Sequence, residues 1–372
     1  MPQEFLLPST SALDLKVTSF FLGPEDLLER DGKLLPHETG FTLDTTKPTP
    51  REIMDAEQGY CFERLANGHI KVGIYIVNPY GIFKALPELF QQVNVRKRTE
   101  YENGRMIQPM VPLKVIEKYS LVPDQKRPTL TISVEVDPQT GKWSQPQIFE
   151  SVFTNKRALT TTEAESYLEL GMDEGLQLND EQLNLLLDAV HALVKRLPEK
   201  KRDQLRHPIK KADLTYTQVA LKLLSELAGE VLAEQSFKNE VPVMFINDVH
   251  SLGESKWPQS TYIPPEMQQL KRLKKLLNIQ MGIKPNDEDW LRTDRPFGHT
   301  SMWYNKNIGV PWYARCTAPL RDVRSLISVL NWSAYLRGEP PLYLPRMINE
   351  LARNLSLEKP MIASKDLLKT VT

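Results

Sequence analysis

Alternation of apolar and polar residues in one short segment constrains the fold most. Residues 69–78 read His-Ile-Lys-Val-Gly-Ile-Tyr-Ile-Val-Asn, so every second residue from Ile70 to Ile76 is an aliphatic one. An extended chain places such residues on one face, and the pattern is typical of a strand with a buried side. Ala66-Asn67-Gly68 is a turn signal directly before it. The sequence therefore predicts a hairpin in which residues 59–65 are the partner strand.

A second alternating segment covers residues 129–137, Thr-Leu-Thr-Ile-Ser-Val-Glu-Val-Asp. The turn formers Pro138 to Gly141 follow it, and another strand is predicted near residues 144–153. The first half of the chain is therefore expected to be rich in β-structure.

Helical spacing of apolar residues dominates the second half. Four segments show it: residues 180–197, 214–234, Pro264 to Leu277, and Pro319 to Leu336. Asn179 is the predicted N-cap of the first, and a short last helix is expected after Pro345. Strands followed by helices predict an α+β fold, in which a mixed β-sheet region in the N-terminal half packs with helices from the C-terminal half.

Composition excludes several classes of protein. Hydrophobic residues make up 41% and charged residues 25% of the 372 residues, which predicts a packed core. No stretch approaches the roughly 18 consecutive apolar residues of a membrane helix, and the N-terminus lacks the pattern of a signal peptide. The two cysteines exclude a disulfide framework. We therefore expect a cytoplasmic protein with no membrane partner.

The formal net charge is zero, which argues against bulk attraction to nucleic acid. Binding of RNA would require a local basic channel. Basic residues do cluster, at Arg96-Lys97-Arg98 and from Arg315 to Arg324 among other places.

Four segments in a fixed order carry the functional signal. Residues 42–83 begin Thr-Leu-Asp and continue with Met-Asp-Ala-Glu-Gln-Gly before the predicted hairpin, and residues 96–112 hold Arg-Lys-Arg-Thr-Glu-Tyr and Pro-Met-Val-Pro. The paired strands at 129–153 come next, and residues 308–339 contain Ala-Pro-Leu-Arg-Asp-Val-Arg before a predicted helix. Over residues 42–340 this order resembles the ribonuclease II catalytic-domain (RNB) family, whose last motif reads Thr-Ser-Pro-Ile-Arg-Arg-Tyr.

The resemblance implies a processive 3′-to-5′ exoribonuclease that hydrolyses single-stranded RNA with Mg²⁺. It implies an RNB-like domain over residues 41–340. Residues 1–40, which are rich in turn formers, are expected to be a leader segment, and residues 341–372 a C-terminal helical tail. Single-stranded RNA is the expected partner, and no DNA is expected. The flanking cold-shock and S1 RNA-binding domains of the family are expected to be missing.

The resemblance also implies roles for individual residues. Asp55 matches the first acid of the Asp-x-Asp-Asp string, Glu57 replaces the second, and Gln58 replaces the third with loss of charge. Arg321 stands at the position of the family's catalytic arginine. The catalytic candidates are therefore Asp55, Glu57, Gln58 and Arg321. The candidate Mg²⁺ ligands are Asp44, Asp55 and Glu57, because hard Mg²⁺ prefers oxygen ligands.

Candidates for substrate binding are Tyr101, Arg98 and Arg324. Tyr101 stands where the family has a tyrosine that stacks on a base, and the arginines belong to the two basic clusters.

Three hypotheses follow. The preferred one is an RNB protein that binds single-stranded RNA with a degenerate metal site and reduced or lost hydrolysis. The alternative is an active Mg²⁺-dependent 3′-to-5′ exoribonuclease that uses Asp44, Asp55 and Glu57, against which the neutral Gln58 argues. The third is an interaction protein that keeps the fold without binding RNA, against which Arg321 and Tyr101 argue.

Overall fold

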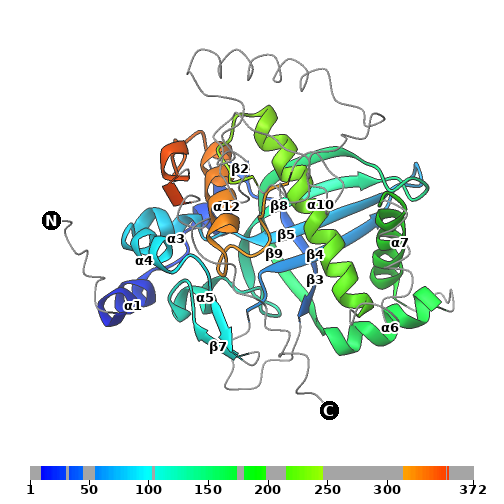
Figure 1. Cartoon of the computed structure of the whole chain (residues 1–372), viewed down its shortest axis with the longest axis horizontal. Helices are drawn as coiled ribbons and strands as arrows, with labels where there is room; N and C mark the ends of the chain where they lie inside the picture. The colour runs from blue at the N-terminus through cyan, green and yellow to red at the C-terminus, as the bar shows by residue number, and fades with distance from the viewer. Residues whose placement is uncertain are drawn as a thin grey trace, which may run out of the picture.

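A closed five-stranded barrel is the centre of the fold (Figure 1). Its strands, in order around the barrel, are β3 (His37–Asp44), β4 (Gln58–Arg64), β5 (Ile70–Val77), β8 (Lys126–Val136) and β9 (Trp143–Thr160). Neighbouring strands are antiparallel except β3 and β9, which pair in parallel and close the barrel.

The computed structural model describes residues 10–30, 33–44, 55–102, 105–173, 180–197, 215–245, 313–348 and 350–351. No helix within these ranges is long and apolar enough to cross a membrane.

The predicted hairpin of β4 and β5 is confirmed. Gln58 pairs with Ile76 at one end and Arg64 with Ile70 at the other. The turn between them places Gly68 at a φ of 83°, a left-handed conformation that glycine adopts without strain. The predicted strands at 129–137 and 144–153 are also confirmed, as the longer strands β8 and β9.

The alternation in β5 separates the two hydrophobic cores. Ile70, Val72, Ile74 and Ile76 belong to one cluster, whereas Tyr75 and Val77 belong to the other. Successive side chains of a strand point to opposite faces, so alternate residues of β5 pack into different clusters on the two sides of the barrel wall.

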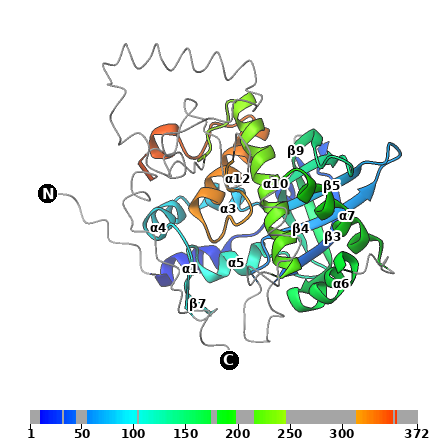
Figure 2. The same ribbon diagram turned by 45° about the vertical axis from the view of Figure 1, so that its right-hand side comes forward.

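Two groups of helices cover the barrel. The first core cluster packs α6 (Thr161–Asp173), α7 (Glu181–Lys195) and α10 (Tyr216–Lys238) against the strands. The second packs α3 (Tyr80–Ala85), α4 (Glu88–Arg96), α5 (Leu113–Tyr119) and α12 (Val323–Leu336). Figures 1 and 2 show this second group together on the left of the barrel, with α6 and α7 on its right. The architecture is α+β, as predicted.

The order of elements departs from strands first and helices afterwards. Two helices, α1 (Thr10–Ser19) and α2 (Pro24–Leu27), precede the barrel, and α3, α4 and α5 lie between its strands. Short two-stranded sheets also occur, formed by β1 (Glu29–Arg30) with β2 (Lys33–Leu34) and by β6 (Glu100–Glu102) with β7 (Arg105–Gln108). Helices this short contain too few turns to give a clear periodic pattern.

Two predicted helix starts are corrected. The N-cap of α7 is Asp180 rather than Asn179, and its carboxylate accepts a hydrogen bond of 3.1 Å from the backbone N–H of Leu183. Helix α12 begins at Val323 rather than Pro319, because Asp322 takes the N-cap position. The helix predicted from Pro264 to Leu277 lies outside the described residues, whereas residues 345–348 and 350–351 are helical as predicted.

Candidate functional site

Arg321 lies in a polar cluster beside the start of β4. Its Nε donates a hydrogen bond to Oε1 of Glu57 and lies 3.6 Å from Oδ2 of Asp55. The same Oδ2 accepts a hydrogen bond of 2.9 Å from the Tyr101 hydroxyl. Residues from three distant parts of the sequence therefore meet in one cluster.

Backbone hydrogen bonds fix these parts relative to one another. The carbonyl of Glu57 accepts from the N–H of Val77 at 3.1 Å, which ties the segment before β4 to the end of β5. The carbonyl of Arg321 accepts from the N–H of Thr99 at 2.8 Å, which brings the turn before α12 next to the segment that carries Tyr101.

Glu57 is the buried anion of the cluster. Its Oε2 accepts a hydrogen bond of 2.5 Å from the backbone N–H of Leu320, so both carboxylate oxygens bind protein donors. Burial raises the pKa of Glu57 above its usual value and Asp55 adds to this rise, whereas Arg321 opposes it and favours the ionised form. The buried Glu57 side chain thus stabilises the turn that contains Leu320 and Arg321.

Arg321 is the cation of the cluster. Burial disfavours its charged form, but the carboxylates of Glu57 and Asp55 outweigh burial and raise the pKa of the guanidinium. Tyr101 as a whole residue is 43% exposed, so it lies at the opening of the cluster towards solvent.

Gln58 faces another part of the structure. Its Oε1 accepts hydrogen bonds from the hydroxyl of Tyr60 at 2.8 Å and of Ser225, in α10, at 3.3 Å. Glu57 and Gln58 are neighbours at the start of a strand, where successive side chains point to opposite sides. The residue that replaces the third acid of the motif is therefore part of the contact between β4 and α10.

The remaining candidates from the sequence are Asp44, Arg98 and Arg324. Asp44 ends β3 and pairs with Thr160, and its side chain lies outside what the structure describes. Arg98 is exposed and forms an isolated antiparallel bridge with Asp322. The guanidinium of Arg324 binds Asp322, with Nη2 2.7 Å from Oδ2. Asp322 was not among the residues predicted from the sequence to form the site.

Mg²⁺ takes several oxygen ligands, usually carboxylates and waters. Among the residues with described side chains, no group of three or more His, Cys, Asp or Glu is arranged to hold a metal ion. Both oxygens of Glu57 are engaged by Arg321 and Leu320, and Gln58 points towards α10. The described donors of the cluster therefore do not fit a Mg²⁺ site.

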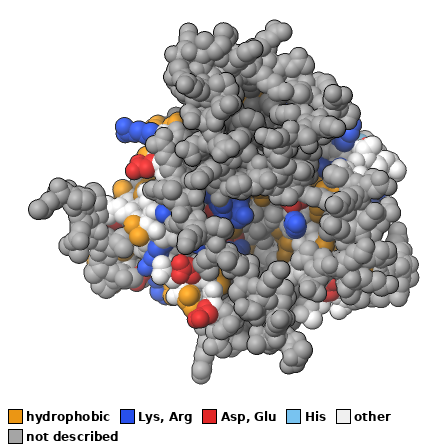
Figure 3. Space-filling model, viewed as in Figure 1, with side chains coloured by type: hydrophobic (Ala, Val, Ile, Leu, Met, Phe, Trp, Pro, Cys, Tyr) orange, Lys and Arg blue, Asp and Glu red, His pale blue; other side chains and the backbone are white. Residues whose placement is uncertain are grey.

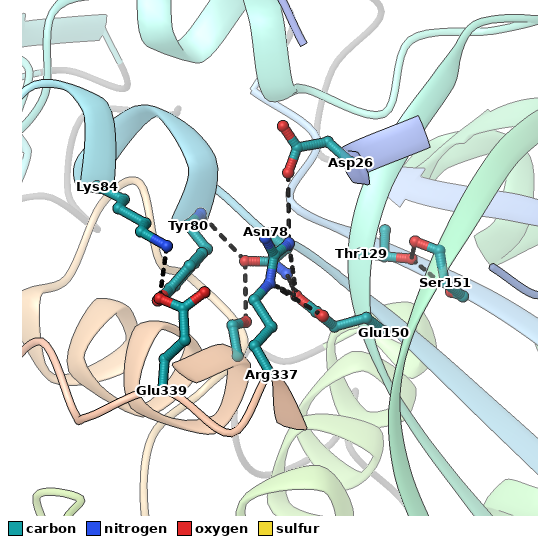
Figure 4. A network of polar contacts seen from close by, with 10 residues as sticks. Asp26, Asn78, Tyr80, Lys84, Thr129, Glu150, Ser151, Arg337 and Glu339 are labelled. Carbon is teal, nitrogen blue, oxygen red and sulfur yellow. Dashed lines mark hydrogen bonds and ion pairs between the residues drawn. The ribbon is translucent and has the colours of Figure 1, made fainter. Parts of the chain in front are cut away.

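A second buried polar network surrounds Arg337, the C-cap of α12 (Figure 4). Its guanidinium binds the carboxylates of Glu150 at 3.1 and 3.2 Å and of Asp26 at 3.3 Å, and lies 4.6 Å from the centre of the Tyr80 ring. Asn78 donates to Glu150 at 2.8 Å. Sequence analysis missed this network because its members are separated by up to 311 positions and share no local spacing.

Comparison with known proteins assigns the fold. The RNB domain matches residues 42–322, which is more than half of the chain. The chain belongs to the RNB domain family. An uncharacterized ribonuclease of Synechocystis sp. is 22% identical over 332 residues, which are 85% of this chain and 46% of that protein. The chain thus spans about half the length of this RNB relative.

Solved structures agree with this assignment. Mycoplasma genitalium RNase R in complex with ribose-methylated single-stranded RNA matches with a TM-score of 0.59 and 13% identity, over 94% of this chain and 58% of that one. The Dss1 exoribonuclease from Candida glabrata gives 0.61 and 15%, over 93% and 49%. Yeast Ssd1, a pseudonuclease, gives 0.60 and 12%, over 94% and 49%. At these identities the likeness shows the RNB fold alone, shared by nucleases and a pseudonuclease.

Proposed function

We propose that this RNB chain binds single-stranded RNA and has a reduced or lost ability to hydrolyse it. The observation that carries the proposal is the position of Glu57, whose two carboxylate oxygens bind Arg321 and the backbone of Leu320. An acid engaged in this way acts as a structural anion.

Phosphodiester hydrolysis needs positive charge at the reacting phosphate and an activated water. Arg321 lies between Asp55 and Glu57, so two carboxylates offset its charge before any substrate arrives. The neutral Gln58 removes a further charge, and its carboxamide is hydrogen-bonded towards α10. These features weaken both requirements.

Binding of RNA is supported by other features of the same surface. The exposed ring of Tyr101 offers a face on which a base can stack, a contact worth about 1–3 kcal/mol per base and tolerant of sequence. Arg98, which follows the end of α4 at Arg96 by two residues, adds an exposed cation. On the face shown in Figure 3, basic side chains are visible near the middle of the molecule, beside acidic and hydrophobic ones. Membership of a family that contains RNA-bound structures points in the same direction.

The test separates binding from hydrolysis. Purified protein is incubated with end-labelled single-stranded RNA and Mg²⁺, beside the variants Gln58→Asp and Arg321→Lys. Arg321→Lys keeps a cation opposite Glu57 and controls for contaminating nucleases. We expect the natural protein to shift the RNA in a gel at low salt and to release no more nucleotide than Arg321→Lys.

Nucleotide release by the natural protein above that control would refute the proposal and favour an active Mg²⁺-dependent exoribonuclease. Release by Gln58→Asp alone would support the proposal and assign the loss to position 58. Failure of the natural protein to shift RNA at low salt would refute RNA binding and favour a role in protein interaction.

A further inference from the structure

A nearly buried carboxylate, Asp322, gathers two arginines at the start of α12. Nη1 of Arg315 lies 3.2 Å from its Oδ2, and Arg324 donates from Nε at 3.0 Å and from Nη2 at 2.7 Å. Asp322 also caps the helix, accepting from the backbone N–H of Arg324 at 2.9 Å. One side chain therefore fixes the helix start and the directions of two guanidinium groups.

Arg98 is placed next to the same carboxylate. Arg98 and Asp322 form an antiparallel bridge, flanked by the hydrogen bonds from Thr99 N–H to the Arg321 carbonyl and from Val323 N–H to the Lys97 carbonyl. In this arrangement the bridged residues are a non-hydrogen-bonded pair, in which side chains lie on the same face and close together. Among the described residues, no ion pair engages the exposed side chain of Arg98.

The charges of this group differ from those around Arg321. Burial acts against the ionised form of Asp322, but Arg324 and Arg315 outweigh it and lower the pKa of that carboxyl. One anion and three cations leave a surplus of two positive charges. Around Arg321, by contrast, one cation faces two carboxylates, so the surplus there is not positive.

The arginines of this group are not adjacent in the sequence. The motif that this segment resembles reads Arg-Arg-Tyr, and here it reads Arg321-Asp322-Val323. Asp322 stands at the position of the motif's second arginine. The arginines that contact its carboxylate, Arg315 and Arg324, lie before and after it in the sequence. The side chain of Arg315 is 48% exposed, so a ligand in solvent can reach it.

We propose that Arg98, Arg315 and Arg324, positioned by Asp322, form a subsite for a phosphate group. The inference rests on the proposed function, under which the ligand is a backbone phosphate of single-stranded RNA. Guanidinium groups bind phosphate oxygens in a fixed planar geometry, and a pair oriented in advance loses little freedom on binding. Asp322 is a positioning residue here, and the RNA contacts are made by the arginines.

Fluorescence anisotropy with labelled single-stranded RNA over a series of salt concentrations tests the subsite. Each lost phosphate contact lowers the slope of log K against log salt by about 0.7 for a single strand. Arg98→Gln/Arg315→Gln is expected to lower the slope by about 1.4 and to weaken binding at low salt about tenfold or more. The matched control is Arg64→Gln, an exposed arginine paired with Asp188 at the far end of β4, with no expected effect.

A charge-balanced variant separates a built subsite from a diffuse basic surface. Asp322→Asn/Arg324→Gln removes one negative and one positive charge, so the net charge is unchanged, and asparagine remains a good N-cap. A diffuse field predicts unchanged affinity, whereas the subsite predicts weaker binding and a smaller slope. Arg324→Lys keeps a cation opposite Asp322 and is expected to fold normally. Its affinity for RNA is expected to lie between that of the natural protein and that of Asp322→Asn/Arg324→Gln.

The outcomes distinguish the two proposals. If the natural protein binds RNA and both double variants behave like Arg64→Gln, the subsite is refuted while RNA binding stands. If the natural protein binds no RNA, inorganic phosphate serves as the probe in thermal unfolding. A rise in Tm for the natural protein that Asp322→Asn/Arg324→Gln lacks then supports an anion subsite that serves free phosphate, and the absence of any rise refutes it.

Discussion

Replacement of Arg337 by methionine tests the buried network at the C-terminal end of α12. The side chain of Arg337 is 9% exposed, and its partners Asp26 and Glu150 are 6% and 3% exposed. Methionine fills much of the same volume and keeps contact with the Tyr80 ring, but it leaves two buried carboxylates without their shared cation. The variant therefore isolates the electrostatic part of the network.

The expected loss of stability follows from these contacts. Removing one partner of a buried ion pair costs about 3–5 kcal/mol, because the charge left behind remains desolvated. Loss of the cation above the Tyr80 ring adds roughly 1–2 kcal/mol in a desolvated site. The sum is an upper bound, since Asn78 continues to donate to Glu150. A decrease of about 3–6 kcal/mol is a large part of the 5–15 kcal/mol typical of a folded domain.

Urea unfolding followed by circular dichroism measures the decrease. Arg64→Met is the matched control, because the Arg64–Asp188 pair is exposed on both sides and such pairs contribute about 0–1 kcal/mol. In the double variant Arg337→Met/Glu150→Gln one of the uncompensated charges is gone, so part of the stability is expected to return. An Arg337→Met protein no less stable than Arg64→Met would show that the network contributes little and that the reasoning is wrong.

Three further predictions concern the site and the barrel. Burial raises the pKa of Glu57 above the usual 4.5, so its contribution to stability is full below about pH 4.5 and is lost as the pH rises through the folded-state pKa. Glu57→Gln is expected to lack this dependence, which amounts to at most about 1.4 kcal/mol per pH unit in urea unfolding. Tyr101→Ala is expected to weaken binding of single-stranded RNA by about 1–3 kcal/mol in anisotropy titrations, whereas Tyr101→Phe, which keeps the ring and loses only the hydroxyl bonded to Asp55, is expected to bind normally; equal losses in both would point to the hydroxyl instead. A Cβ at Gly59 would lie 2.5 Å from the Phe153 ring, so Gly59→Ala is expected to destabilise the barrel by about 1–3 kcal/mol in thermal unfolding, with partial recovery on adding Phe153→Leu.

The strands were predictable because their signal is local. Alternation in 69–78, with Asn67-Gly68 before it, identified β5, the turn and the partner strand together. The long helices were predictable for the same reason. Closure of the barrel was not, because the parallel pairing of β3 with β9 joins residues more than a hundred positions apart, such as His37 and Val152. No spacing within either strand indicates that partner.

The site was predictable only through the order of its motifs. Asp55, Tyr101 and Arg321 were singled out by resemblance, and the structure brings them into contact. The direction of each side chain was not available from the motif. Glu57 and Gln58 stand side by side in the sequence, yet one binds the turn before α12 and the other binds α10. Asp322 was missed because an aspartate before a helix is an ordinary N-cap in sequence, and its two arginine partners become visible only in space.

The replacements in the acidic motif have a common physical consequence. Glutamate is one methylene longer than aspartate, and the carboxylate of Glu57 spans to Arg321 and to the N–H of Leu320 at the same time. This contact stabilises the turn that precedes α12, and the same turn positions Asp322 and its arginines. Positive charge near the turn is therefore neutralised on the side of Asp55 and Glu57 and left in surplus on the side of Asp322. We propose that a surface arranged in this way holds the backbone of an RNA strand beside Arg321, which is the property expected of a binding protein with an RNB fold.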